Sequence, residues 1–151
     1  METNAALNAD GFPEGVHPLD HTADIGIDIR ADSLPQLFCN AALGLVVFTC
    51  PRGAPNAAVG PRSVETVRLQ ADDAALLLAA WLRELLYLME IRRLCFVHAD
   101  FSELGPHALD ASVVLAPCST AIREIKGVTY HELEVRAEPG GGFRARVIFD
   151  V

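Results

Sequence analysis

The sequence has few basic residues for its length. It carries 12 Lys and Arg against 20 Asp and Glu, which gives a formal net charge of −8 over 151 residues. Proteins that bind nucleic acid without sequence preference rely on Lys and Arg to neutralise phosphates. This composition therefore argues against a domain that holds RNA or DNA by itself. An acidic domain can still serve an RNA pathway by contacting a protein partner or an ion.

Long apolar runs are also absent. Hydrophobic residues make up 51% of the chain, yet no uninterrupted run approaches the ~20 residues of a membrane-spanning helix. Residues 1–18 are small, polar and acidic, and they lack the basic start and apolar centre of a secretory signal. We therefore expect a cytoplasmic protein with a flexible N-terminal tail over residues 1–18 and a single domain over residues 19–151.

The cysteines lack the spacing of a zinc site, because none of them forms a C-x-x-C pair. A disulfide framework is unusual in a chain that is long enough to bury its own core. All four cysteines lie within or beside apolar stretches. We expect buried free thiols at Cys39, Cys50, Cys95 and Cys118.

Familiar catalytic motifs are missing as well. The sequence has no G-x-x-x-x-G-K-[ST] loop, no G-x-S-x-G elbow and no H-E-x-x-H helix. Its glycine cluster at residues 140–142 joins two expected strands and does not open a helix, so it is not a nucleotide-binding loop. The residues suggest no set of nucleophile, base and oxyanion donors.

The chain does contain clear strand and helix patterns. Residues 24–30 alternate apolar and polar side chains, which predicts a strand. Ser33 opens a capping box before a helix that ends before Pro51. Asp72 or Asp73 caps a second helix that runs to about residue 90.

The remaining residues complete the predicted fold. Further strands are expected at residues 63–69, 94–101, 109–115, 128–137 and 143–151, with a surface loop at residues 50–62. Two helices among about six strands indicate an α+β fold. We predict a two-layer sandwich in which both helices cover one face of a mostly antiparallel or mixed sheet.

Alternation along two of these strands places two aspartates on one face of the sheet. The isoleucines of residues 24–30 face the core, so Asp24 points away from it; Phe149 faces the core, so Asp150 points away. If the strands are neighbours, the carboxylates converge, joined by the α-carboxylate of Val151 where that residue is the terminus. Two carboxylates about 4 Å apart repel by roughly 4 kcal/mol at an effective dielectric near 20. This favours a hard cation such as Ca²⁺, Mg²⁺ or Mn²⁺, and the alternative is a pair of solvated aspartates.

Four further side chains are candidates to support such a site. His21 is a possible metal ligand, although a histidine beside a strand also commonly hydrogen-bonds backbone or capping groups. Asp20 either orients a ligand or occupies a turn. Glu84 lies near the buried stripe of the second helix, where it can reach the metal, pair with Lys126 or turn to solvent. Lys126 is, on its chemistry alone, an ordinary lysine at a strand edge.

Four segments, in this order, resemble the archease family. They are residues 20–26 (DHTADIG), residues 72–73 with 81–87 (DD and WLRELLY), residues 124–131 (EIKGVTYH) and residues 147–151 (VIFDV). The resemblance covers the chain from about Leu19 to its end. The set of four segments is specific, although no single one is.

The resemblance implies an auxiliary protein and not an enzyme. Archeases assist the GTP-dependent RNA ligase RtcB in tRNA splicing and RNA repair, by promoting its guanylylation and its multiple turnover. Family members bind a divalent metal through three residues that correspond to Asp24, Asp150 and Val151. As a separate hypothesis, which the resemblance itself does not imply, Lys126 contacts a phosphate of a nucleotide such as GTP, or a carboxylate of the ligase.

The chain departs from the family pattern at Arg83, where asparagine or aspartate is usual, and at Ser119, where histidine is frequent. These changes concern contacts other than those with the metal ion. They leave open that the protein's partner is an enzyme other than RtcB. Two other functions also stay open. One is a small divalent-metal-dependent phosphohydrolase that uses the same carboxylates to activate water. The other is a chaperone-like modulator of another RNA-processing enzyme.

Overall fold

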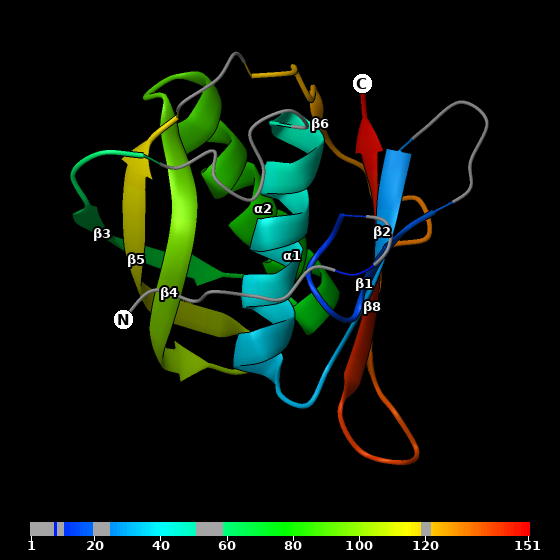
Figure 1. Cartoon of the computed structure of the whole chain (residues 1–151). Helices are drawn as coiled ribbons and strands as arrows, with labels where there is room; N and C mark the ends of the chain where they lie inside the picture. Colours follow the sequence, from blue (N-terminus) through cyan, green and yellow to red (C-terminus); the bar gives the residue numbers. More distant parts are fainter. Residues whose placement is uncertain (1–7, 9–10, 20–24, 51–58, 119–121) are drawn as a thin grey trace.

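The structure, a computed structural model, describes residue 8 and residues 11–19, 25–50, 59–118 and 122–151. Within these residues, two helices lie between two antiparallel sheets (Figure 1). The helices are α1 (Leu34–Thr49) and α2 (Ala74–Glu90). One sheet contains β1 (Val16–Pro18), β2 (Ile25–Ala31), β6 (Gly127–Val128), β7 (Glu134–Ala137) and β8 (Phe143–Asp150); the other contains β3 (Ser63–Gln70), β4 (Leu94–Leu104) and β5 (Ala108–Pro117).

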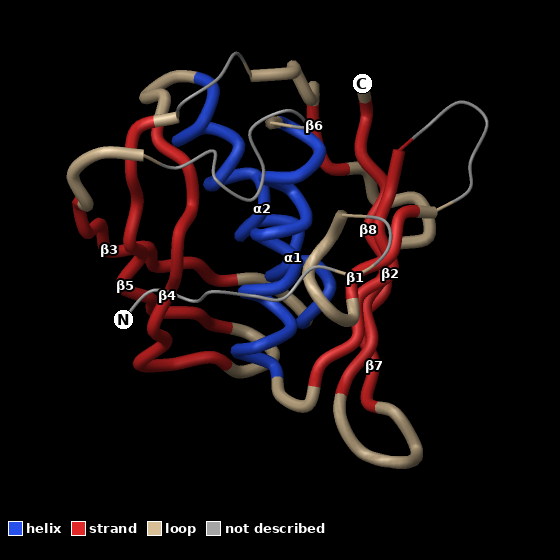
Figure 2. Tube along the Cα trace, in the orientation of Figure 1, coloured by secondary structure: helices blue, strands red, loops and turns tan. Residues whose placement is uncertain are grey.

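The α+β class, the two helices and the antiparallel pairing agree with the sequence analysis. The strands divide between two sheets, however, and do not form a single sheet of about six strands. The larger sheet has the order β1-β2-β8-β6 with β7 also paired to β8, and the smaller has the order β3-β5-β4 (Figure 2). The helices are therefore covered from two sides.

The burial pattern of α1 explains why it needs two sheets. At 100° per residue, Leu37, Asn40 and Val46 lie on different sides of the helix, yet all three are buried. A single sheet would leave part of this apolar surface in water. Burial around the helix thus calls for a second layer of strands, which the predicted single sheet did not include.

Both helices begin at the predicted caps. The Ser33 side chain accepts a hydrogen bond from the backbone N–H of Gln36 at 3.3 Å. The Asp73 side chain accepts one from the backbone N–H of Leu76 at 2.8 Å, which selects Asp73 over Asp72 as the cap of α2. Each cap satisfies a backbone donor that has no partner within its helix.

Trp81 of α2 lies at the centre of the contact between the helices and the smaller sheet. Its side chain is fully buried, and its indole Nε1–H donates to the backbone carbonyl of Phe38 at 3.0 Å. Its ring also contacts the rings of Phe38, Phe96 and Phe101. This cluster joins α1, α2 and β4 around one aromatic side chain whose polar atom is satisfied.

Part of the expected N-terminal tail is ordered. Val16–Pro18 forms β1, which pairs with β2, and the side chains of Phe12 and Val16 are buried. Gly15 has a φ of +85°, and an added Cβ would lie 2.5 Å from the Arg30 carbonyl oxygen. Glycine there permits close packing of the chain against β2.

Two other expected segments differ in detail. The strand expected at residues 128–137 is divided into β6 and β7, with Glu132 between them at a φ of +54°. Of the loop expected at residues 50–62, residues 51–58 lie outside the described part of the chain. All four cysteines are free thiols, as predicted. No helix in the described ranges is long and apolar enough to cross a membrane.

Candidate functional site

The predicted metal ligand Asp150 is the last residue of β8. Strands β2 and β8 are neighbours, as the site hypothesis required, and their pairing runs from Ala31↔Phe143 to Ile25↔Phe149. Side chains of Ile27 and Phe149 are fully buried, whereas Asp150 is exposed. The predicted alternation holds at these positions, but Ile148, which was expected to face outward on the side of Asp150, is only 1% exposed.

Three of the predicted site residues lie outside the described residues: Asp20, His21 and Asp24. Asp24 directly precedes Ile25, whose partner Phe149 directly precedes Asp150. Among the described residues, no group of three or more His, Cys, Asp or Glu side chains is placed to hold a metal ion. The predicted metal set includes Asp24, so it stays a prediction.

Lys126 lies beside Asp150. Strand β6 pairs with the end of β8 through Gly127↔Asp150, and the Lys126 backbone N–H donates to the Asp150 carbonyl oxygen at 2.7 Å. Both side chains are exposed, and Val151 is 39% exposed. One end of the larger sheet thus presents a lysine, an aspartate and the following Val151 to solvent, next to the C-terminal end marked in Figure 1.

Among the described residues, Glu84 does not pair with Lys126, one of the contacts that the sequence suggested, and its contact with a metal stays a prediction. It is half-buried on α2, and within the described ranges no hydrogen bond or ion pair links it to another residue, Lys126 included. Its neighbour Arg83 instead reaches the segment that follows Lys126. The Arg83 guanidinium lies 4.9 Å from the centroid of the Tyr130 ring, and its Nη2 donates to the Val128 carbonyl oxygen at 3.4 Å.

The sequence did not predict the contact of Arg83 with Tyr130. Both residues belong to segments that were singled out, but 47 positions separate them and neither segment predicts its distance from the other. A guanidinium over an aromatic face is attracted by the negative charge of the ring face. Arg83 therefore links α2 to the chain between Lys126 and Tyr130.

A second carboxylate on the outward face of the same strand pair is already neutralised. Asp28 accepts two hydrogen bonds from Arg144, at 3.0 Å from Nε and 2.6 Å from Nη2. This pairing raises the pKa of the Arg144 guanidinium, because Asp28 stabilises its charged form. A bidentate pair of this kind occupies both carboxylate oxygens, so Asp28 is a poor candidate for a metal ligand.

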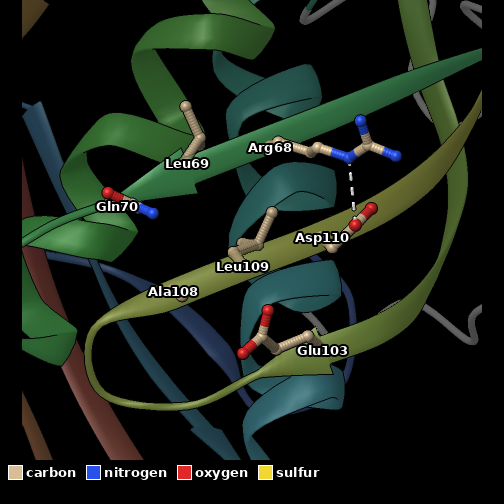
Figure 3. A pocket seen from close by; sticks show the side chains of 7 residues that line it. All are labelled: Arg68, Leu69, Gln70, Glu103, Ala108, Leu109 and Asp110. Carbon is tan, nitrogen blue, oxygen red and sulfur yellow. Dashed lines mark hydrogen bonds and ion pairs between the residues drawn. The ribbon is translucent and has the colours of Figure 1, made fainter.

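Two pockets among the described residues lie on or beside the smaller sheet. One of about 390 Å³ opens on the smaller sheet and is lined by Arg68, Leu69, Gln70, Glu103, Ala108, Leu109 and Asp110 (Figure 3). Within it, Arg68 Nε donates to Asp110 Oδ2 at 3.0 Å. A second pocket, of about 380 Å³, lies beside it at residues 70–72 and 107–108. Neither contains a predicted site residue or a paired nucleophile and base.

Comparison with known proteins gives a consistent result. The model of the Archease protein family (MTH1598/TM1083) matches residues 17–151. Proteins called archease are similar over most of their length: the one from Methanosarcina mazei is 32% identical, over 88% of this chain and 93% of the relative. The one from Thermococcus kodakarensis is 30% identical, over 87% of this chain and 95% of the relative.

Solved structures agree with the sequence matches. The solution structure of protein 1598 from Methanobacterium thermoautotrophicum superposes with a TM-score of 0.66 at 28% identity, covering 91% of this chain and 99% of that one. The crystal structure of an archease from Thermotoga maritima, described as a possible chaperone, has a TM-score of 0.62 at 18% identity and shows the shared fold. The chain belongs to the archease family.

Proposed function

We propose that this protein activates a GTP-dependent RNA ligase of the RtcB type, by promoting guanylylation and multiple turnover of the ligase in tRNA splicing or RNA repair. The observation that carries this proposal is the match to the archease family over residues 17–151. The net charge of −8 supports action through a protein partner, since the chain has too few cations to hold RNA tightly by itself. We place this activity in the cytoplasm.

The exposed end of β8 is the part of the protein that we assign to the activity. We propose that Asp24 and Asp150 hold one hard divalent cation there, with the α-carboxylate of Val151 as a third donor where Val151 is the last residue. The pairing of Ile25 with Phe149, the sequence neighbours of the two aspartates, supports this assignment. Carboxylate oxygens suit Ca²⁺, Mg²⁺ or Mn²⁺ and do not select zinc or copper.

The side chains around this end have distinct roles in the proposal. A bound cation would supply positive charge that attracts phosphate oxygens. Lys126, whose backbone is hydrogen-bonded to Asp150, would add a second positive charge that contacts a nucleotide phosphate or a carboxylate of the ligase. Asp20 and His21 would orient the ligands of the ion. The nucleotide in question is GTP in the active site of the ligase.

Guanylylation of the ligase tests the role of the acidic end. A purified ligase is mixed with labelled GTP and either the wild-type chain or the Asp150→Ala variant, and the labelled ligase–GMP adduct is followed over time. We expect the wild-type chain to accelerate adduct formation and the variant to lose most of this effect. The control is Asp100→Ala, which removes a 75% exposed carboxylate from the smaller sheet and should stimulate like the wild type.

The same assay separates the alternatives. Full stimulation by Asp150→Ala would contradict the role of the acidic end, and no stimulation by the wild-type chain would contradict the whole proposal. The Thermotoga maritima archease, described as a possible chaperone, favours one second candidate, a chaperone-like modulator of another RNA-processing enzyme. That candidate predicts no effect on guanylylation but protection of a client from aggregation. A phosphohydrolase would release phosphate from a phosphate ester with no ligase present.

A further inference from the structure

One side of α2 presents large apolar side chains to solvent. Tyr87 is exposed, and so is Ile91, the residue that caps the C-terminal end of the helix. Residues four apart on a helix are neighbours on one face, so Arg83, Tyr87 and Ile91 form a row about 12 Å long. Leu85 and Leu88, which lie between them in the sequence, point into the core and are buried. The row is therefore the solvent side of a helix whose other sides are packed.

The chain around β6 lies against both ends of this row. The Arg83 guanidinium is 4.9 Å from the centroid of the exposed Tyr130 ring and donates to a backbone carbonyl of β6 at 3.4 Å. At the other end, the Glu90 carboxylate accepts a hydrogen bond from the Ile125 N–H at 3.3 Å, so the chain next to Lys126 lies beside the C-terminal end of α2. We use the name helix patch for five residues: Arg83, Tyr87, Ile91, Lys126 and Tyr130.

The helix patch lies in a positively charged part of a chain that is acidic overall. Residues 83–93 and 123–130 carry five cationic side chains against three carboxylates, whereas the whole chain has a net charge of −8. The cations are Arg83, Arg92, Arg93, Arg123 and Lys126. Arg92 is paired with Glu65 of β3, and cations remain in excess when that carboxylate is counted. Charge complementarity therefore selects an acidic partner surface.

We propose that the helix patch is the surface by which this protein docks on the RNA ligase, against a part of the ligase that carries carboxylates around an apolar centre. This inference rests on the proposed function, because it takes the ligase as the partner. The patch adjoins the end of β8 that we assign to activation, since the Lys126 N–H donates to the Asp150 carbonyl oxygen at 2.7 Å. Tyrosine and arginine are also the residue types that often contribute most to the affinity of protein interfaces.

The contacts of Arg83 favour a protein surface over RNA as the occupant. A site for single-stranded RNA offers free aromatic faces to bases and free cations to phosphates. Here the Arg83 guanidinium already lies over the Tyr130 ring and donates to a backbone carbonyl. This contact instead restrains Tyr130 before a partner arrives, which lowers the entropy cost of docking. Ile91 offers an apolar side chain that suits a protein contact.

Binding of purified ligase to the full-length chain tests the helix patch. Dissociation constants are measured by biolayer interferometry for the wild type, Ile91→Glu and Tyr87→Ala, and circular dichroism shows that each variant is folded. Both variants should bind about tenfold or more weakly, the first because it places a negative charge against an acidic surface and the second because it removes a ring. The matched control is Val64→Glu, the same change at a side chain on β3 that is 65% exposed, against 67% for Ile91. It should bind like the wild type.

Stimulation of guanylylation separates docking from activation. A high concentration of Ile91→Glu should restore the full rate, because this variant weakens only docking, whereas Asp150→Ala should remain poor at every concentration. The inference alone is overturned if the wild type binds the ligase and Ile91→Glu binds equally well, or if Val64→Glu loses as much affinity as Ile91→Glu. It is also overturned if the two patch variants lose binding to single-stranded RNA but not to the ligase. A wild-type chain that neither binds nor stimulates the ligase overturns the proposed function, and this inference with it.

Discussion

At the scale of single residues, the outward face of the β2–β8 pair carries two carboxylates in different states. Asp28 is held in a bidentate ion pair by Arg144, whereas Asp150 has no ion pair with any cation among the described residues. A paired carboxylate has little to gain from a metal ion, and an unpaired one beside further anionic groups has more to gain. The difference gives a matched pair of variants.

Asp150→Asn should weaken divalent-metal binding, because it removes one negative ligand while it keeps the size of the side chain. A loss of about tenfold or more in affinity is expected, similar to that caused by removing supporting groups around a metal. Isothermal titration with Ca²⁺, Mg²⁺ and Mn²⁺ measures it. Asp28→Asn is the control and should bind metal like the wild type; equal loss in both variants, or none in either, would contradict the assignment.

At the scale of helices and strands, the sequence predicted the structure best. Caps at Ser33 and Asp73 and the alternation in β2 and β8 are local patterns, so they could be predicted without knowledge of distant contacts. Short elements were predicted poorly: β1 was not expected and β6 was not separated from β7, because strands of three and two residues are too short for a periodic pattern. The contact of Lys126 with Asp150 depends on β6, so it could not be predicted either.

The cap of α2 supports a stability prediction. Asp73→Ala removes the side chain that accepts from the Leu76 N–H, and it should lower the free energy of unfolding by about 1 kcal/mol. Chemical denaturation followed by circular dichroism measures this change. Asp72→Ala, one residue earlier, should change it by only a few tenths of a kcal/mol. A larger loss at Asp72 than at Asp73 would show that the cap is assigned to the wrong aspartate.

Gly26 supports a second prediction, at the contact of β2 with β8. An added Cβ would lie 2.7 Å from the Val147 carbonyl oxygen and 2.9 Å from Leu19 Cδ1. Because the backbone of β8 cannot move away without disturbing the ladder, Gly26→Ala should destabilise the fold by about 1–3 kcal/mol. Thermal unfolding compares it with Gly105→Ala, where nothing lies within 4 Å of the added atom. Equal melting temperatures for both variants would contradict the close approach.

At the scale of the whole molecule, the sequence predicted the α+β class but not the division of the strands into two sheets. Period-two patterns identify strands without saying which of them pair, and the division between two sheets depends on contacts between distant segments. The same limit applies to the site. The alternation of side chains along β8 could place Asp150 on the outward face. The ion pair of Asp28 with Arg144, however, forms only when the chain is folded. The same holds for the contact of Arg83 with Tyr130.

The most direct test of the central claim is the number of RNA joints formed per ligase molecule. Purified RtcB-type ligase, GTP, divalent metal and an excess of RNA ends are incubated with and without this protein, and the joined RNA is counted against the ligase. We expect each ligase molecule to join many RNA molecules when the protein is present and about one when it is absent, because activation restores guanylylation after each cycle. Equal yields in the two reactions would contradict the account.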